Sequence, residues 1–336
     1  MFPTAQRCWP LLLKFSDAID FVKTETLMQN ESRIYVAGHR GMVGSAITRR
    51  LGDAGYRNIL TRTHAELPLD DTAAVEAFFA AERPEYVVLA AAKVGGIIAN
   101  STQGGDFIRE NLKIQTNVID AAYRHGAEKF MFLGSSCIYP KFAEQPIAEE
   151  ALLTGALEET NLPYAVAKIA GITMCDAYSK QYGFNTFAVM PPNVYGIGDN
   201  FHPEHSHVVA GLMRRFHEAK QSNLPEVVVW GTGSPLRELI DADDLADACV
   251  FLLRGYNDGG IINVGSGQEI SVKELALLTK SVVGFEGTVS FDSARPDGTP
   301  RKIMDSSKLR SIGWRPTLNI ETGLKKMYAW YCETQA

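Results

Sequence analysis

The chain has 336 residues, 46% hydrophobic and 21% charged, which is typical of a soluble globular protein with room for two domains. Its 33 Lys and Arg against 39 Asp and Glu give a net charge of −6, which argues against nucleic-acid binding, because that needs a basic surface. Five cysteines without a Cys-x-x-Cys pair argue against a disulfide framework or zinc ribbon and fit a cytoplasmic protein. No apolar run approaches the roughly 20 residues that span a bilayer, so we expect no membrane partner.

Residues 1–30 differ from the rest of the chain, and we expect them to be an N-terminal extension, non-native or disordered. The apolar patch Trp9–Leu13 is followed at once by charged residues, unlike the longer hydrophobic region of a secretory signal. The first strand-like run begins only at Arg33, which favours Met28 as the natural start. An amphipathic helix packed on the surface is the alternative.

From Arg33 onward, β-branched apolar runs alternate with helical periods. The strand-like runs are continuously apolar, so both faces of their sheet should be covered. This alternation predicts right-handed βαβ crossovers and an α/β fold with a Rossmann-type doubly wound parallel sheet. The expected strands are 34–37, 58–62, 86–91, 129–133 and 185–190. The expected helices are 43–51, 72–80, 107–125 and 164–182.

After Pro191-Pro192 the alternation becomes irregular and its segments become short. We expect residues 31–190 to form the Rossmann domain, with 238–266 returning to it. Residues 191–336 should then form a smaller C-terminal α/β domain that binds the substrate. No low-complexity linker separates the two halves, so they should be in tight contact.

A glycine-rich turn joins the first expected strand to the first expected helix: Gly38, His39, Arg40, Gly41, Met42, Val43 and Gly44. Glycines here permit a tight turn and let the backbone approach a diphosphate, which then sits on the free N–H groups of the helix start. Glycine-rich loops are common, and the position between strand and helix is what indicates a dinucleotide site. A purely structural turn is the alternative.

The end of the second strand selects between the two nicotinamide cofactors. An acidic residue there would accept the ribose 2′-hydroxyl of NAD, whereas an arginine would pair with the 2′-phosphate of NADP. Arg62 stands at this point with no carboxylate before Glu66, and Arg40 can reach the same corner. We therefore predict NADP(H), with ordinary surface charges as the alternative reading of both arginines. Asp70 is either an adenine contact or the N-cap of the next helix.

Tyr164 and Lys168 form the only Tyr-x-x-x-Lys in the sequence. At i and i+4 on a helix their side chains share a face. A lysine ammonium beside a phenol favours the phenolate, which predicts a lowered tyrosine pKa and proton transfer near neutral pH. Ser135 or Ser136, at the end of the fourth expected strand, can donate to the same substrate oxygen. An ordinary surface pair is the alternative.

Together these motifs resemble the extended short-chain dehydrogenase/reductase family, and within it the branch that epimerises and then reduces GDP-4-keto-6-deoxymannose. The resemblance runs from about Arg33 to the C-terminus. Its most specific segments are AGHRGMVGSAI, LAAAKVGGI, FLGSSCIYPK, YAVAKIAGI, DNFHPEHSHV, VVVWGTGSPLRE and PDGTPRK. The resemblance implies an NADPH-dependent conversion of GDP-4-dehydro-6-deoxy-D-mannose to GDP-L-fucose.

The same resemblance implies catalytic roles for five residues. Ser135, Tyr164 and Lys168 match the reductase triad of the family, while Cys137 and His207 match the base and acid of its epimerisations. These residue types suit the chemistry, because the protons at C3 and C5 are acidified by the C4 ketone and both side chains titrate near working pH. A small buried hydrophobe is the alternative reading of Cys137.

The binding residues follow in the same way. Beside the glycine turn and Arg62, the resemblance places the cofactor against Leu133, Gly134, Ser136, Lys168, Pro191, Pro192, Asn193, Val194 and His207. Contacts to the GDP-sugar are expected from Arg215, Trp230, Arg237, Asp297 and Lys302. Guanidinium forks suit phosphate oxygens and an indole offers a face for guanine, with surface charges and a core indole as the alternatives.

Three further expectations concern metal, cysteines and assembly. The histidines of loop 202–207 lack a spaced ligand cluster, so we expect no metal. Cys175 and Cys249 lie in apolar helical stretches and should be core. The apolar faces of 107–125 and 164–182 predict a homodimer, since these helices pair two subunits in the resembling family. Burial within one subunit is the alternative.

Two other functions stay open at this point. A related nucleotide-sugar epimerase or dehydratase would keep its NAD bound and recycle the hydride. A dinucleotide-sensing protein on the same fold would bind without turnover, because fold alone does not fix function. The intact serine, tyrosine and lysine of the triad argue against the second.

Overall fold

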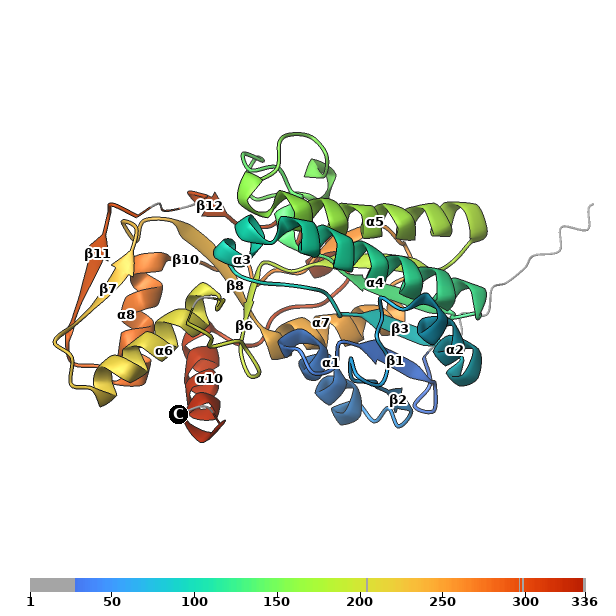
Figure 1. The fold of residues 1–336 in the computed structure, drawn as a ribbon, viewed down its shortest axis with the longest axis horizontal. Coiled ribbons are helices and arrows are strands. Elements are labelled where there is room, and N and C mark those ends of the chain that lie inside the picture. The colour runs from blue at the N-terminus through green and yellow to red at the C-terminus, as the bar shows by residue number, and fades with distance from the viewer. Residues whose placement is uncertain (1–27, 204, 296, 298, 335–336) are drawn as a thin grey trace, which may run out of the picture.

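The computed structural model describes residues 28–334 except 204, 296 and 298 (Figure 1). Six strands form one sheet in the order β2-β1-β3-β4-β5-β9, and all neighbouring pairs are parallel. They are β1 (Ile34–Ala37), β2 (Ile59–Leu60), β3 (Tyr86–Leu89), β4 (Lys129–Leu133), β5 (Thr186–Met190) and β9 (Ile261–Asn263). The predicted doubly wound α/β sheet is confirmed. The expectations for residues 1–27 lie outside the described residues.

Helices cover both faces of this sheet. Successive side chains of a strand point to opposite faces, so apolar residues at every position leave both faces to be buried. Ile34 and Val36 of β1 pack into one core, whereas Tyr35 and Ala37 pack into the other. The first core is covered by α1 (Met42–Asp53) and α7 (Ala242–Gly255), and the second by α2 (Thr72–Glu82), α4 (Gly104–Arg124) and α5 (Leu162–Tyr182). This double coverage explains why the strands read as continuous apolar runs.

The remaining elements form a second, smaller layer at the other end of the molecule (Figure 1). Strand β8 (Leu236–Asp241) pairs with β10 (Glu269–Ser271), β12 (Arg301–Lys302) and β6 (Asn193–Tyr195), and β7 (Glu226–Trp230) pairs with β11 (Thr288–Asp292). Their core also contains α6 (Val208–Gln221), α8 (Val272–Val283) and α10 (Ile320–Thr334). Shorter helices are α3 (Ile97–Thr102), α9 (Ser307–Ser311) and 3-10 turns at Ser136–Ile138, Glu149–Ala151 and Glu159–Asn161.

The chain crosses between the two layers more than once. After β8 it returns as α7, which packs against α1, and as β9, which pairs with β5 and completes the large sheet. The buried side chain of Asn263, at the end of β9, accepts a hydrogen bond from the Tyr139 hydroxyl (2.6 Å) and donates to the Ile147 and Asp305 carbonyls. Polar contacts as well as apolar packing therefore hold the layers together.

Local chemistry explains where the elements differ from expectation. Strand β2, at the edge of the sheet, pairs over two residues rather than five. Helix α5 begins two residues early, with Pro163 in its first turn, where a missing N–H costs nothing. The α2 cap is Asp71, which accepts from the Ala73 and Ala74 N–H groups, so the suggested cap Asp70 is wrong.

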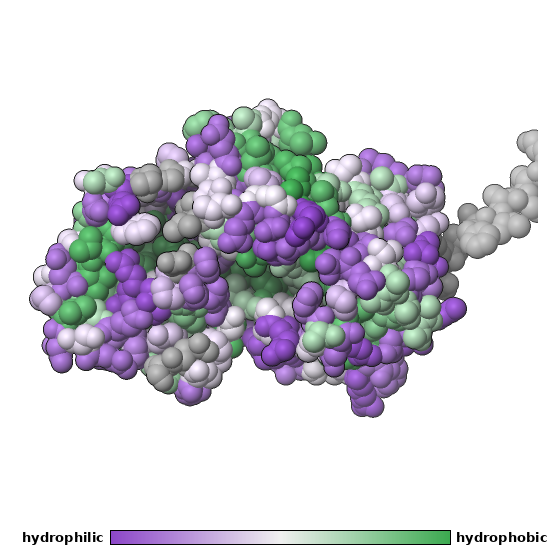
Figure 2. All heavy atoms as spheres, viewed as in Figure 1, coloured by the Kyte–Doolittle hydropathy of each residue, from purple (hydrophilic) through white to green (hydrophobic). Residues whose placement is uncertain are grey.

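Among the described residues, no helix has the length and apolar character to cross a bilayer. Apolar surface does gather around the start of α5 and the loops before it (Figure 2). The exposed residues there are Phe142, Leu153, Leu162 and Val166.

Candidate active site

The glycine turn between β1 and α1 is shaped for close backbone approach. Gly38 has a φ of +87°, and a Cβ there would lie 2.6 Å from the Ala91 nitrogen. A Cβ on Gly44 would lie 2.1 Å from the Gly38 carbonyl oxygen. No side chain caps α1, and its first turn carries no acidic residue, so its positive end faces the turn. The residues present therefore fit a dinucleotide diphosphate.

The predicted adenosine corner is partly occupied by protein contacts. Arg62 pairs with Glu82 through Nη2 (2.5 Å), donates to the Thr61 carbonyl (2.8 Å), and lies 5.3 Å from the centroid of the Phe78 ring. Arg40 is exposed at the rim of the glycine turn. The two arginines stand on neighbouring loops, and Arg40 is the more accessible of them.

Ser135 lies between the two other reactive side chains of the strand end. It caps the 3-10 turn after β4, where its Oγ accepts from the Cys137 N–H (3.3 Å). The same hydroxyl lowers the pKa of both Tyr164 and the Cys137 thiol. Tyr164 comes from the first turn of α5 and packs edge-on against Phe107. The parallel sheet thus brings the predicted serine, cysteine and tyrosine into one cluster.

Burial, rather than the neighbouring lysine, determines the direction in which the pKa of Tyr164 shifts. Burial raises the pKa of Tyr164, the charge of Cys137 raises it further, and the Ser135 hydrogen bond lowers it. The expected lowering by Lys168 is therefore wrong. The reason is that Lys168 Nζ donates to the Leu133 carbonyl (2.7 Å) and lies 4.8 Å from the centroid of the Phe132 ring. Burial lowers the pKa of Lys168 to about 8. A protonated phenol suits an acid that delivers a proton.

The candidate epimerisation residues sit in different surroundings. Burial raises the pKa of the Cys137 thiol, while Lys302, Ser135 and Lys168 lower it. His207 is the N-cap residue of α6, and loss of hydration lowers its pKa, so the ring is neutral at pH 7. Cys175 and Cys249 are fully embedded in the two sheet cores, as expected.

Loop Pro191–Val194 follows β5 and meets the strand end of β4. The Ser136 N–H donates to the Pro191 carbonyl (3.1 Å), and the Gly134 N–H donates to the Val189 carbonyl (2.9 Å). Asn193 and Val194 then begin β6. The sheet therefore sets this loop beside Leu133–Ser136, as the expected nicotinamide site requires.

Four of the five expected GDP-sugar contacts lie on adjacent elements. Lys302 of β12 stands opposite Arg237 of β8, and Arg237 Nη2 donates to the Asp297 carbonyl (3.5 Å). Trp230 is 58% exposed, so the core reading is wrong, and Arg295 lies 5.0 Å from the centroid of its ring. The fifth residue, half-buried Arg215 on α6, donates to the Val228 carbonyl of β7.

Sequence reasoning missed Thr232, in the turn between β7 and β8. Its N–H and hydroxyl both donate to the Asp297 carboxylate, at 2.7 and 2.8 Å. A Cβ on Gly231, whose φ is +83°, would lie 2.3 Å from the Asp297 Oδ1. No signal in the sequence separates this threonine from other turn threonines, because its partner lies 65 residues away.

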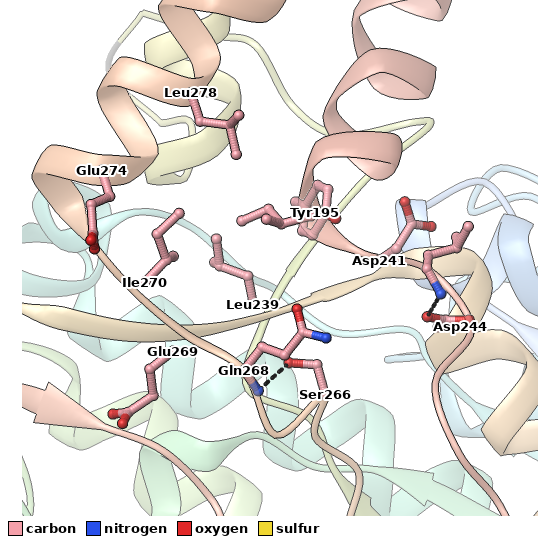
Figure 3. Close-up of a pocket in the computed structure, with 12 residues that line it drawn as sticks. Tyr195, Leu239, Asp241, Asp244, Ser266, Gln268, Glu269, Ile270, Glu274 and Leu278 are labelled. Carbon is pink, nitrogen blue, oxygen red and sulfur yellow. Dashed lines mark hydrogen bonds between the residues drawn. The ribbon is translucent and has the colours of Figure 1, made fainter.

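Two cavities lie near the second layer, one lined by β12 and the other by β8. One of about 60 Å³ touches Cys137 and Lys302. The other, of about 310 Å³, has Tyr195, Leu239 and Ile270 around its centre (Figure 3). None of the expected site residues is among its described lining. The described residues also contain no group of three or more His, Cys, Asp or Glu side chains that could hold a metal.

Comparison with known proteins shows the family to which the chain belongs. The model of the NAD dependent epimerase/dehydratase family matches residues 34–265. The chain belongs to this family. It is 61% identical to the putative GDP-L-fucose synthase 2 of Arabidopsis thaliana, over 91% of this chain and 94% of that one. It is 50% identical to the GDP-L-fucose synthase of Escherichia coli strain K12, over 91% and 98%.

A solved structure shows the same likeness in three dimensions. The GDP-L-fucose synthetase from Naegleria fowleri bound to NADP superposes with a TM-score of 0.84 at 26% identity. The match covers 91% of this chain and 96% of that one.

Replacing Gly44 tests the tight turn. Gly44→Ala forces a methyl group against the Gly38 carbonyl, so we expect about 1–3 kcal/mol less stability in urea unfolding and weaker NADPH binding in a fluorescence titration. Gly52, in the same α1, meets nothing within 4 Å, and Gly52→Ala should stabilise the protein by roughly 0.5–1 kcal/mol. Equal stability of Gly44→Ala and the native chain would contradict the geometry.

The buried carboxylate of Asp199, in the loop before His207, should make the stability of the protein depend on pH. Burial raises its pKa from 3.8 to about 7, and its Oδ2 has no hydrogen-bond partner among the described residues. The folded chain therefore holds this proton more tightly than the unfolded one, and the resulting stability is present below about pH 4 and lost as pH rises through about 7. Asp199→Asn should melt a few degrees higher than the native chain at about pH 8 and show no such advantage near pH 4. Exposed Asp70→Asn is the control, and a pH-independent difference would refute the assignment.

Proposed function

We propose that this enzyme converts GDP-4-dehydro-6-deoxy-D-mannose to GDP-L-fucose by 3,5-epimerisation followed by NADPH-dependent reduction of the C4 ketone. The observation that carries the proposal is the cluster in which the Ser135 hydroxyl accepts from the Cys137 N–H (3.3 Å) and lowers the pKa of both the Cys137 thiol and the Tyr164 phenol. One ring bound there would meet an epimerising thiol and a reducing acid together. The GDP-L-fucose synthases that share 50–61% of the sequence support the same reaction.

The cofactor is NADP(H), held at its diphosphate by the glycine turn and α1. Lys168, Leu133–Ser136 and Pro191–Val194 lie at the end where the nicotinamide would bind, and Arg40 with Arg62 lies at the 2′-phosphate end. The NADP-bound Naegleria structure supports this choice. When bound, NADPH supplies the hydride for C4. The protein orients the two reactants and excludes water.

The epimerisation uses the thiol and the imidazole. The proton at C3 or C5 is acidic because the carbanion delocalises onto the C4 ketone oxygen as an enolate. Cys137, as thiolate, removes that proton, and His207, after it has taken up a proton from solvent, delivers that proton to the opposite face. Lys302 and Lys168 lower the thiol pKa against the effect of burial, which favours the thiolate needed for the first step. Ser135 and Tyr164 hydrogen-bond the enolate oxygen.

The reduction uses the same oxygen. As C4 accepts hydride, its oxygen becomes an alkoxide, and the Tyr164 hydroxyl donates its proton to that oxygen. Burial keeps this phenol protonated at neutral pH, as an acid requires. Lys168 holds the strand end through the Leu133 carbonyl (2.7 Å), with its Nζ 5.8 Å from the centroid of the Tyr164 ring.

The GDP moiety extends along the second layer. Arg215, Arg237 and Lys302 supply positive charge for the diphosphate, and the exposed face of Trp230 accepts the guanine. Residues 31–190, together with α7 and β9 of the expected return at 238–266, form the cofactor domain, and the rest of 191–336 forms the substrate domain. The exposed apolar residues of α5 support a homodimer, and the unpaired Cys137, Cys175, Cys249 and Cys332 support a cytoplasmic location.

Turnover tests this function directly. Incubation with GDP-4-keto-6-deoxymannose and NADPH should consume NADPH in equal amount and give GDP-L-fucose by NMR. Product formation without NADPH loss would instead identify an epimerase or dehydratase that retains NAD. Tight NADPH binding with no change in the sugar would identify a sensor.

Removing the thiol should separate the two half-reactions. Cys137→Ser should slow exchange of the C3 and C5 hydrogens with D2O by at least about 100-fold, because a hydroxyl is a far weaker base than a thiolate. NADPH affinity should stay within about twofold, since the thiol faces the sugar. Cys332→Ser, at an exposed site, is the matched control. Native exchange rates in the Cys137 variant would sink the assignment.

Removing the phenol should give the complementary result. Tyr164→Phe should lower the reduction rate by about 10²–10⁴-fold, the usual contribution of general acid catalysis, while exchange at C3 and C5 persists. Tyr178→Phe alters a tyrosine on the same helix, where its hydroxyl donates to Asp120 (2.9 Å), and should reduce normally. Full reduction by Tyr164→Phe would refute its role.

A further inference from the structure

Glu238 of β8 is a buried carboxylate whose two oxygens bind two separate backbone segments. It is 1% exposed, and burial raises its pKa. Its Oε1 accepts from the Gly267 N–H (2.7 Å), and its Oε2 accepts from the Met304 N–H (2.9 Å). Burying a carboxylate costs free energy unless its oxygens are satisfied, so both hydrogen bonds are needed to keep it there.

The loop after β9 leaves room for the Glu238 carboxylate because residue 265 is glycine. A Cβ on Gly265 would lie 2.3 Å from the Glu238 Oε1, so a side chain there would displace it. The Gly265 N–H donates to the buried Ser306 hydroxyl (2.8 Å), which ties the same loop to the segment after β12. Glu238 therefore joins β8 to loop 265–267 and to the chain beyond Lys302.

That second anchor matters because the ladder between β12 and β8 is short, and it acts together with the Ile147 backbone, which pairs with Ile303 and Asp305 (2.9 and 2.8 Å). The strand is two residues long, and its ladder with β8 pairs only Arg301 with Leu236 and Lys302 with Arg237. So short a pairing is weak by itself. The Met304 N–H, two residues further on, is fixed by Glu238, and the neighbouring Ile303 N–H by Gln145 Oε1 (2.9 Å).

We propose that Glu238 is a positioning residue that holds the Lys302 ammonium beside the Cys137 thiol. Lys302 and Cys137 line the same cavity of about 60 Å³. Lys302 is the charge that lowers the thiol pKa most. Glu238 touches neither group, and it acts by fixing the backbone on which Lys302 stands. The importance of the thiolate rests on the proposed function, whereas the positioning itself does not.

Other charges around the pair are fixed by different elements. The titratable groups and the serine that face Cys137 or Lys302 are Ser135, Tyr139, Lys141, Glu158, Tyr164, Lys168, Arg237 and Arg301. The charges that face Glu238 are Glu269 and Arg310. Among them, Arg301 of β12 pairs with Glu269 (2.6 Å), which is the ladder partner of Glu238. A change at Glu238 therefore reaches the thiol through the position of Lys302.

Alkylation of Cys137 measures the thiolate without any substrate. Iodoacetamide is added to the full chain over a range of pH, and the Cys137 peptide is quantified by mass spectrometry, because only the thiolate reacts appreciably. In Glu238→Gln, the amide group cannot accept from both N–H groups, so Lys302 moves away. We expect the midpoint of the profile to move to higher pH and the rate at neutral pH to fall by up to about tenfold, which is one pKa unit.

A double-variant cycle tests whether the effect of Glu238 on the Cys137 thiol passes through Lys302. Lys302→Met should shift the profile in the same direction, and Glu238→Gln added to it should cause no further shift. Glu274→Gln is the matched control, since Glu274 also binds backbone and hydroxyl groups of the same layer, at Ser271, but lines the larger cavity. It should lower the melting temperature and leave the profile unchanged.

The alkylation results test the positioning role of Glu238 whether or not the enzyme turns over its substrate. A Glu238→Gln protein with a lower melting temperature and a native alkylation profile would overturn the proposal, as would additive shifts in the double variant. Should Glu238→Gln fail to fold, Gln145→Ala removes the neighbouring anchor and must shift the profile the same way. If the shifts occur but Cys137→Ser still exchanges hydrogens normally, the positioning stands and the proposed role of the thiol falls.

Discussion

The chemistry of this protein depends on the burial of three titratable side chains at the end of one parallel strand. Burial raises the pKa of Cys137 and Tyr164 and lowers that of Lys168, in each case favouring the neutral form. Nearby positive charge opposes this effect for the thiol, although its pKa stays raised, and a protonated phenol is already what a reducing acid needs. One hydroxyl, Ser135, connects the two groups.

The fold explains why these residues meet. The carboxyl ends of β1, β4 and β5 open on the same edge of the sheet, so the glycine turn, the strand-end serine and loop 191–194 converge there. The second layer then adds β8 and β12, which carry Arg237 and Lys302 side by side. Glu238 and Asn263 join the layers through buried polar contacts, so the site is fixed by elements from both.

The sequence predicted the sheet, the main helices and the glycine turn, because each depends on local periodicity or spacing. It also grouped Ser135, Tyr164 and Lys168, since strand ends and helical i, i+4 pairs have known geometry. It misjudged the Tyr164 pKa, because the balance between burial and a charged neighbour depends on tertiary packing. Thr232 and Glu238 escaped notice, since their partners are distant in the chain and no local pattern marks them.

The central claim is that thiol, phenol and nicotinamide converge on one sugar ring, and a crystal structure with NADP⁺ and GDP-L-fucose bound tests it most directly. The account predicts the sugar O4 within about 3 Å of the Tyr164 and Ser135 hydroxyls, with the Cys137 sulfur facing C3 or C5. A sugar ring seated in the cavity beyond β8, or one turned away from Cys137, would contradict it.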